Sequence, residues 1–340
     1  MKHKVIFTTD RGEWHQQMAL DGAPEGLEVV MLRKPEKAAL LAALQDTDFL
    51  ISERFGRIDT EIIQNAPKLK LIQRLGSLVH DIDLVAAAQA GVAVCYMPIG
   101  SVIHVAEHLV MQILAVAKKL GEVESVALAA SLDWGESRRT DEDTFAYNWS
   151  NRLGVRSIWG QTIGTIGFGE IGVEFARRMA AWGCQLLYHK RNRLPAAVET
   201  DLRLAYVSQA ELFTRSDILV NLLPYGIGTD MLLNATVFEQ MKTGAILVSC
   251  GSGSTIDETA LAAAVRSSRL AGAALDTFEY EPIQADNPLI AAANEGYNIL
   301  LTPHTAAGTP DHKEQIPDRS EDYVNITYFI AGKPLVYQVV

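Results

Sequence analysis

A glycine-rich segment carries the most specific chemistry in this sequence. Residues 164–172 read GTIGFGEIG, a GxGxxG spacing that follows a strand-like run and opens a helix-like one. In such a unit Gly167 permits the tight turn, Gly169 lets the backbone approach a pyrophosphate, and Gly172 allows close helix packing. Backbone amides and the dipole at the helix start then bind the anion. The segment predicts a dinucleotide site, the alternative being a glycine turn that binds nothing.

A basic stretch follows at the end of the next expected strand. An acidic residue there normally hydrogen-bonds the adenosine ribose and disfavours a 2′-phosphate. Here the position holds His189, followed by Lys190, Arg191 and Arg193. Because guanidinium groups pair with phosphate in a bidentate fork, the stretch favours NADP(H), with NAD(H) possible and a solvated basic turn as the alternative.

Alternating strands and helices must position these residues. In the first hundred residues the pattern predicts strands at 5–8, 29–32, 49–52, 69–74 and 92–96, and helices at 37–44, 60–65 and 83–90. A second series begins at residue 162. It has strands at 162–166, 185–188, 218–222, 245–249 and 299–302, another strand just before Asp276, and helices at 170–182, 209–215 and 257–268. A longer helix is expected at 104–120, a polar stretch at 133–159 and an amphipathic helix at 318–331. This βαβ rhythm predicts an α/β protein with two Rossmann-like, doubly wound parallel-sheet domains.

Composition excludes several other classes of protein. The chain has 340 residues, 48% of them hydrophobic and 21% charged, which argues against disorder and favours two packed domains. A net charge of -11 argues against nucleic acid or an anionic membrane as the main partner. Cys95, Cys184 and Cys250 form no CxxC pair, so a reducing compartment is expected. The short apolar run at the N-terminus does not read as a signal peptide, and we expect a cytoplasmic protein.

Further motifs extend over nearly the whole chain. They are APKLK at 66–70, RLG at 74–76, VAEH at 105–108, MKTGAILV at 241–248, DE at 257–258, LAGAALD at 270–276, EP at 281–282 and TPH at 302–304. Together with the glycine segment they resemble the D-2-hydroxyacid dehydrogenase family, which includes D-lactate, glycerate, phosphoglycerate and formate dehydrogenases and glyoxylate/hydroxypyruvate reductases. The resemblance implies a discontinuous, flavodoxin-like substrate domain (1–99 plus 308–340), a Rossmann domain (100–307), an active site in the cleft between them, and a homodimer formed through the Rossmann domain.

The resemblance also assigns catalytic roles. His304 matches the family's acid/base and Glu281 its carboxylate partner, which orients the ring and favours its protonated form. Asp276 matches an aspartate beside the nicotinamide, with a loop-capping role as the alternative. The full set of expected cofactor contacts is Gly167, Gly169, Glu170, Ile171, Gly172, His189, Lys190, Arg191, Arg193, Leu223, Pro224, Cys250, Gly251, Asp276 and His304.

The sequence departs from the family pattern at one position that is expected to bind the substrate. Where the family has an arginine for the substrate carboxylate, this chain has Ser252, which cannot form a bidentate charged pair. Arg54 is the preferred replacement, and the Gly76-Ser77 loop is expected to offer backbone amides, although Leu78 replaces a family glycine. Other possible anchors are Arg74, Arg138, Arg139 and Arg152.

Three other groups of residues are not expected to take part in catalysis. His80, His104 and His108 with Glu107 suggest a metal site, but no metal is expected. Cys250 is expected to pack rather than react. The aromatic residues of the polar stretch, Trp134, Tyr147 and Trp149, fit an interface better than a substrate wall.

The resulting functional hypothesis is an NAD(P)-dependent oxidoreductase that transfers a hydride between nicotinamide and a small 2-keto or 2-hydroxy acid or a related carbonyl compound. Two alternatives stay open. One is a diverged nucleotide-sensing or scaffold protein, suggested by Ser252. The other is an enzyme that uses bound NAD(P) transiently for elimination, isomerisation or hydrolysis.

Overall fold

The computed structural model describes residues 2–53, 56–308 and 319–340 and divides the chain into two compact units. Unit 1 comprises residues 1–102 and 309–340, and unit 2 comprises residues 103–308. The expected domain boundaries, 99/100 and 307/308, lie within a few residues of these divisions. Both units are α/β, as predicted, and each is described by itself.

Unit 1 is built on a five-stranded parallel sheet in the order β2-β1-β3-β4-β5. This is the flavodoxin-like order. Its strands are β1 His3–Thr9, β2 Leu27–Arg33, β3 Phe49–Glu53, β4 Leu71–Leu75 and β5 Ala93–Met97, and its helices include α1 Glu13–Asp21, α2 Lys37–Leu44, α3 Thr60–Gln64 and α4 Leu84–Ala90. The sequence pattern missed α1, because only Met18 and Ala19 of that helix are buried.

Side chains alternate between the two faces of this sheet. Ile6 and Leu50 belong to one apolar cluster, whereas Phe7 and Ile51 belong to the other. The second cluster also contains residues of the C-terminal segment, where η3 Ser320–Tyr323 and α13 Val324–Ile330 replace the single helix expected there. Buried Tyr323 donates to the carbonyl of Ala19, which ties the C-terminal segment to α1.

Unit 2 contains a seven-stranded sheet in the order β12-β11-β10-β9-β6-β7-β8, with every pair parallel. The order reverses between β6 and β9, and ligands of such sheets bind beyond the carboxyl ends of the strands at this point. Its strands are β6 Thr162–Ile166, β7 Gln185–His189, β8 Leu204–Tyr206, β9 Ile218–Asn221, β10 Ala245–Ser249, β11 Leu270–Leu275 and β12 Ile299–Leu301. Helices packed with it are α7 Glu170–Met179, α8 Ala196–Asp201, α9 Gln209–Arg215, α10 Ala235–Gln240, α11 Glu258–Arg266 and α12 Pro288–Asn294, with a 3-10 turn, η2, at Gly253–Thr255.

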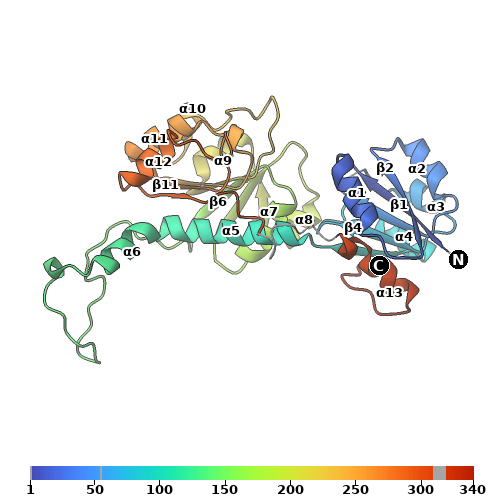
Figure 1. Ribbon diagram of the computed structural model, residues 1–340, viewed down its shortest axis with the longest axis horizontal. Helices are drawn as coiled ribbons and strands as arrows, with labels where there is room; N and C mark the ends of the chain where they lie inside the picture. The colour runs from blue at the N-terminus through green and yellow to red at the C-terminus, as the bar shows by residue number, and fades with distance from the viewer. Residues whose placement is uncertain (1, 54–55, 309–318) are drawn as a thin grey trace. The chain divides into compact units, whose positions relative to one another are not determined.

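The chain passes from unit 1 to unit 2 within α5 Gly100–Ala117, which begins and ends before the expected 104–120. By length and composition this helix could cross a membrane, and half of it is buried inside the protein. A second helix, α6 Leu120–Ala129, was not predicted; Lys119, with φ of 52°, separates it from α5. It is followed by η1 Leu132–Trp134 and by irregular chain to 161, and these segments extend away from the sheet of unit 2 (Figure 1).

Candidate active site

The glycine turn lies at the carboxyl end of β6, where the strand order of unit 2 reverses. Gly167 has φ of +84°, and a Cβ there would lie 2.6 Å from the backbone nitrogen of Leu223 and 2.6 Å from the carbonyl carbon of Leu222. A side chain at this position would therefore collide with the chain leaving β9. Helix α7 starts three residues later with Glu170. The sequence thus forms the strand, turn and helix start that a pyrophosphate requires.

One arginine of the basic stretch after β7 is paired with a carboxylate of the chain. Arg193 Nε and Nη2 donate to the two carboxylate oxygens of Glu199 at 2.8 and 2.7 Å. Together with the Tyr188 hydroxyl, Arg193 lowers the pKa of Glu199 to about 2. Glu199 already engages the guanidinium fork of Arg193, and a contact between Arg193 and the cofactor stays a prediction.

The other two cations of this stretch differ in burial. Arg191 is exposed, whereas Lys190 is half-buried, and burial lowers the Lys190 pKa while the nearby Glu170 carboxylate acts in the opposite direction. His189 lies with Nδ1 2.9 Å from the Val207 carbonyl and stacks on Tyr206. Lys190 and Arg191 are thus the cations of this stretch that could contact a 2′-phosphate.

Ser252, Asp276 and His304 follow three neighbouring strands, β10, β11 and β12, at the same edge of the sheet. His304 Nδ1 lies 2.7 Å from Glu281 Oε2. The backbone nitrogen of Phe278 donates to the other oxygen of Glu281 at 3.1 Å, which fixes the carboxylate. Because Nδ1 faces Glu281, Nε2 is the ring nitrogen left to exchange a proton with a ligand. Both side chains are partly exposed, so a small molecule can reach them.

Asp276 is fully buried and organises the loop that carries His304. Its carboxylate accepts hydrogen bonds from the Thr302 hydroxyl at 2.6 Å and from the backbone nitrogens of Thr305 and Ala306 at 3.0 and 2.8 Å. Its backbone carbonyl accepts from the nitrogen of His304 at 2.8 Å. These contacts match the loop-capping alternative, and they are compatible with a place beside the cofactor as well.

A polar cluster behind this loop was not recognised in the sequence. His108 Nε2, on α5, lies 3.0 Å from Thr302 Oγ1 and 3.5 Å from Asp276 Oδ1. One turn further along α5, fully buried Gln112 places Oε1 3.5 Å from Cys250 Sγ. Burial, with the Asp276 charge acting in the same direction, raises the pKa of the Cys250 thiol, so this cysteine stays protonated at neutral pH. The available signal was a pair of polar residues at i and i+4 within an apolar helix.

Ser252, at the position where the resemblance places the substrate arginine, carries no charge. Its backbone nitrogen donates to the Leu223 carbonyl at 2.8 Å, and its carbonyl accepts from the Thr255 hydroxyl at 2.6 Å, so the loop is held by its backbone. Leu223 lies against two glycines. A Cβ at Gly167 or at Gly251 would come within 3 Å of its backbone nitrogen.

Most arginines considered as replacements are paired with other residues or lie on irregular chain. Arg74 is 4% exposed and forms an ion pair with Asp81, so it is not a free anchor for a substrate. Arg152 pairs with Glu122 at 3.4 Å and lies over the Trp134 ring. Arg138 and Arg139 are exposed on irregular chain. Arg54 lies outside the described residues.

The loop after β4 and a cavity of about 380 Å³ belong to unit 1 alone. Gly76 donates its backbone N–H to the Met97 carbonyl at 2.8 Å, and Ser77 is buried beside it. In the cavity, buried Glu53 accepts from Arg319 at 3.2 Å, and Arg11 Nε lies 3.4 Å from Glu53. Arg11 follows β1 at the sheet edge where ligands bind, a position that sequence reasoning overlooked.

Comparisons with known proteins agree with this geometry. Residues 110–306 match the model of the D-isomer specific 2-hydroxyacid dehydrogenase NAD-binding domain. A glyoxylate reductase from Aeropyrum pernix is 31% identical over 88% of this chain and 84% of its own length. A D-3-phosphoglycerate dehydrogenase from Mycobacterium leprae is 30% identical over 85% of this chain, which spans about half of that longer protein (51%).

Solved structures show the same architecture. The TT0316 protein from Thermus thermophilus aligns with 99% of this chain and 100% of its own, at a TM-score of 0.54 and 28% identity. The PH0520 protein from Pyrococcus horikoshii aligns with 100% of this chain and 95% of its own, at a TM-score of 0.57 and 25% identity. These similarities favour the oxidoreductase hypothesis over the sensing and transient-cofactor alternatives. The chain belongs to the D-isomer specific 2-hydroxyacid dehydrogenase family, and its residues 110–306 are the NAD-binding domain of that family.

Proposed function

We propose that the protein reduces the carbonyl group of a small 2-keto acid, or oxidises the matching 2-hydroxy acid, with a nicotinamide cofactor. The observation that carries the proposal is the His304–Glu281 pair, with a 2.7 Å contact, on the sheet edge that also carries the glycine turn. A bound nicotinamide would supply or accept the hydride. The residues of the chain must then bind the cofactor, orient the carbonyl group and move one proton.

His304 performs the proton step in this proposal. Protonated imidazole donates from Nε2 to the carbonyl oxygen during reduction and takes the proton back during oxidation. Glu281 acts as a positioning residue because its carboxylate holds Nδ1 and stabilises the imidazolium. Asp276 fixes the loop between Thr302 and Ala306, and so sets where the ring lies.

Replacing His304 with alanine tests the proposal. Turnover of NADPH with glyoxylate, hydroxypyruvate or pyruvate should fall by about 10²- to 10⁴-fold, the usual contribution of a general acid, while the dissociation constant of NADPH changes little. His3→Ala, a histidine on β1 of unit 1, is the matched control and should keep wild-type turnover. Full activity of the His304→Ala variant would exclude the mechanism.

We further propose NADP(H) as the preferred cofactor. The support is the absence of a carboxylate at His189 and the presence of two cations, Lys190 and Arg191, that Glu199 does not engage. A 2′-phosphate would also offset the cost of keeping the half-buried Lys190 charged, since burial lowers its pKa.

The carboxylate anchor is proposed to be Arg54, since Arg74 is already paired with Asp81. Arg54→Gln should lose activity towards 2-keto acids while reduction of uncharged carbonyl compounds is unaffected, because a neutral amide cannot pair with a carboxylate. Arg33→Gln, which changes an exposed arginine at the end of β2 in the same way, is the control. Equal turnover of charged and uncharged carbonyls by the wild type would contradict a 2-keto acid as substrate.

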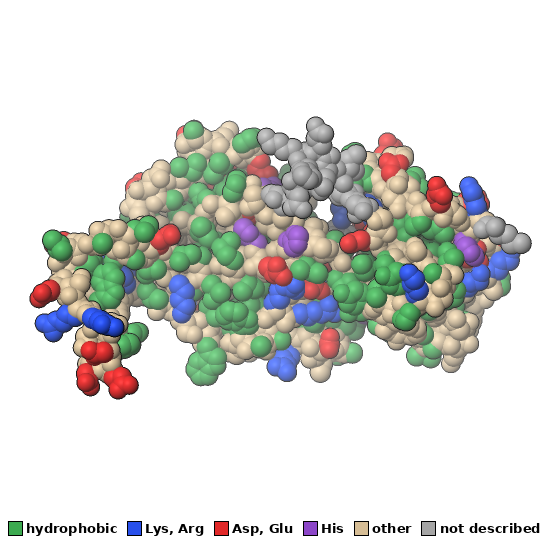
Figure 2. Space-filling model, turned by 60° about the horizontal axis from the view of Figure 1, so that its bottom comes forward, with side chains coloured by type: hydrophobic (Ala, Val, Ile, Leu, Met, Phe, Trp, Pro, Cys, Tyr) green, Lys and Arg blue, Asp and Glu red, His purple; other side chains and the backbone are tan. Residues whose placement is uncertain are grey.

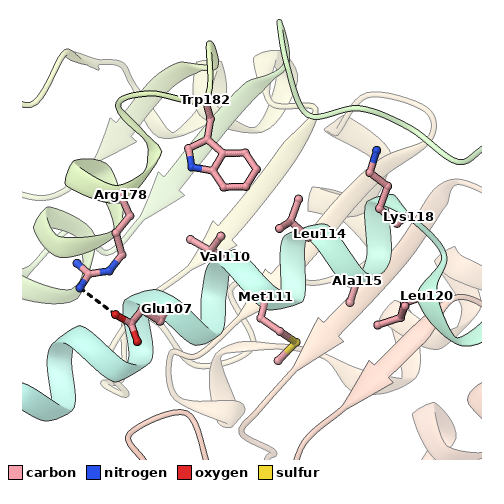
Figure 3. Close-up of a pocket in the computed structure, with 9 residues that line it drawn as sticks. All are labelled: Glu107, Val110, Met111, Leu114, Ala115, Lys118, Leu120, Arg178 and Trp182. Atoms are coloured by element: carbon pink, nitrogen blue, oxygen red, sulfur yellow. Dashed lines mark hydrogen bonds and ion pairs between the residues drawn. The ribbon is translucent and has the colours of Figure 1, made fainter.

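We also propose that the protein is a cytoplasmic homodimer formed through unit 2. A groove of about 710 Å³ runs along α5. Figure 3 shows Val110 and Leu114 on the side of α5 toward Trp182, Met111 pointing away from Trp182, and an ion pair between Glu107 and Arg178. Apolar side chains are also numerous on the face of unit 2 turned forward in Figure 2. The irregular segment after α6 exposes further large apolar side chains, namely Leu132, Phe145, Tyr147, Leu153 and Trp159.

A second copy is the occupant that best fits this groove, because the apolar segment of one chain can cover the groove of another. Met111 is 40% exposed, so Met111→Glu should convert the dimer to a monomer in light-scattering measurements without loss of folding. Exposed Glu124→Gln on α6 is the control. A wild-type mass equal to one chain would contradict the proposal.

A further inference from the structure

We propose that His108, Cys250 and Asp276 form a binding site for a divalent transition-metal ion, with Zn²⁺ as the best match. The three residues come from α5, from the end of β10 and from the end of β11, all within unit 2. One ligand atom from each lies within 4.8 Å of the other two. Imidazole, thiolate and carboxylate are the ligand types that Zn²⁺ takes in proteins.

The spacing of the ligand atoms fits a tetrahedral ion. Bonds of roughly 2.0 to 2.3 Å place neighbouring ligand atoms of such a site about 3.3 to 3.8 Å apart. His108 Nε2 and Asp276 Oδ1 are already 3.5 Å apart. The Cys250 sulfur lies within 4.8 Å of a ligand atom of each of the other two residues. The Asp276 carboxylate is held by backbone nitrogens at Thr305 and Ala306, so this ligand is already fixed in place.

Gln112 supplies an independent indication that a further group binds beside these three residues. The side chain is fully buried, and its amide nitrogen has no hydrogen-bond partner within the part of the chain that the structure describes. Leaving a buried donor unpaired costs about 1 to 3 kcal/mol, and this N–H needs an acceptor such as a water molecule bound to the metal ion. The Gln112 oxygen lies 3.5 Å from Cys250 Sγ and faces the thiol, where it could become a fourth ligand.

Binding of one metal ion releases one proton, which comes from the Cys250 thiol. The Cys250 thiol loses its proton to solvent and forms a metal–sulfur bond, while His108 breaks its contact with the Thr302 hydroxyl and binds through Nε2. A dication favours both anionic ligands at once, the Cys250 thiolate and the Asp276 carboxylate.

The position of the site predicts inhibition by zinc. Cys250 and Asp276 are also expected at the nicotinamide end of the cofactor site, so an ion bound to them would compete with the cofactor. This consequence rests on the proposed function, whereas metal binding itself does not.

The experiment is a titration of the full chain, freed of metal with a chelator, with Co²⁺ followed by absorbance and with Zn²⁺ followed by calorimetry. One Co²⁺ should bind per chain and produce a thiolate-to-cobalt charge-transfer band in the near ultraviolet. Cys250→Ser should remove the band, and His108→Gln should weaken binding by about 10- to 100-fold. Cys184→Ser is the matched control, because Cys184 is a half-buried thiol of the same unit that donates to the Ile158 carbonyl.

The outcomes separate the two claims. A wild type that binds no metal, or a charge-transfer band that survives in Cys250→Ser but disappears in Cys184→Ser, would overturn the site. Circular dichroism checks that each variant is folded. If Cys250→Ser does not fold, the loss of metal affinity in His108→Gln tests the site instead. Saturating NADPH should raise the apparent dissociation constant for Zn²⁺. If NADPH leaves the dissociation constant for Zn²⁺ unchanged, the metal site stands, but its overlap with the cofactor site is refuted.

Discussion

Replacement of Arg191 by glutamine should weaken NADPH binding and leave NADH binding almost unchanged. A hydrogen bond to a charged group contributes about 1.5 to 3 kcal/mol, and the exposure of Arg191 favours the lower end of that range. Because about 1.4 kcal/mol corresponds to a factor of ten, the dissociation constant for NADPH should rise about 10- to 20-fold. NADH lacks the 2′-phosphate, so its constant should change by less than about twofold.

The adjacent arginine provides a control of the same chemistry. Arg193→Gln removes an identical charge two positions along the chain, but Arg193 already donates two hydrogen bonds to Glu199 at 2.8 and 2.7 Å. We therefore expect the NADPH dissociation constant of this variant to stay within about threefold of wild type, since only a screened, long-range charge is lost.

Fluorescence titration of the full chain with NADPH and NADH at one fixed ionic strength measures these constants. Weakening of NADPH by Arg193→Gln as large as that by Arg191→Gln would refute the assignment of the two arginines. Equal weakening of both cofactors by Arg191→Gln would refute recognition of the 2′-phosphate.

Individual contacts lead to three further predictions. Gly167→Ala should abolish cofactor binding in a titration, because its Cβ would lie 2.6 Å from the backbone of Leu223 at a φ of +84°; binding by this variant would refute the turn geometry. Glu281→Gln should lower kcat for carbonyl reduction, because a neutral amide holds the His304 ring less firmly than the carboxylate 2.7 Å away, and unchanged turnover would contradict the pairing. Burial raises the pKa of Asp322 from 3.8 to about 6, so this group favours folding while protonated and the benefit is lost as the pH rises through about 6. The melting temperature of Asp322→Asn relative to wild type should therefore increase between about pH 4 and pH 6, and a decrease would contradict the sign.

The regular part of this fold could be predicted from sequence because its signals are local. β-branched runs separated by helical spacing marked all five strands of unit 1, and the GxGxxG segment marked the strand, turn and helix at β6. Helix α1 was missed since its sequence, EWHQQMALD, buries only two side chains and shows no clear apolar stripe. The break between α5 and α6 depends on a positive φ at Lys119, which its residue type does not signal.

Contacts between distant residues account for the features of the site that the sequence did not show. Arg193 pairs with Glu199 on the following helix, which becomes its neighbour only through the turn between them. Arg74 is buried and forms an ion pair with Asp81. The polar cluster of His108, Gln112 and Cys250 joins α5 to β10 across more than a hundred residues, a separation that spacing cannot reveal. The geometry of His304 and Glu281, in contrast, matches the expected pairing, while their catalytic roles stay predictions.

The most direct test of hydride transfer to a 2-keto acid follows the transferred hydrogen itself. NADPH carrying deuterium at C4 of the nicotinamide, prepared as each of the two stereoisomers, is incubated with the full chain and pyruvate, and the product is analysed by mass spectrometry and chiral chromatography. The account predicts D-lactate with one deuterium at C2 from one stereoisomer of the cofactor, and loss of this product in the His304→Ala variant. A 2-hydroxy acid without deuterium from either stereoisomer, or labelled product formed equally well by His304→Ala, would contradict it.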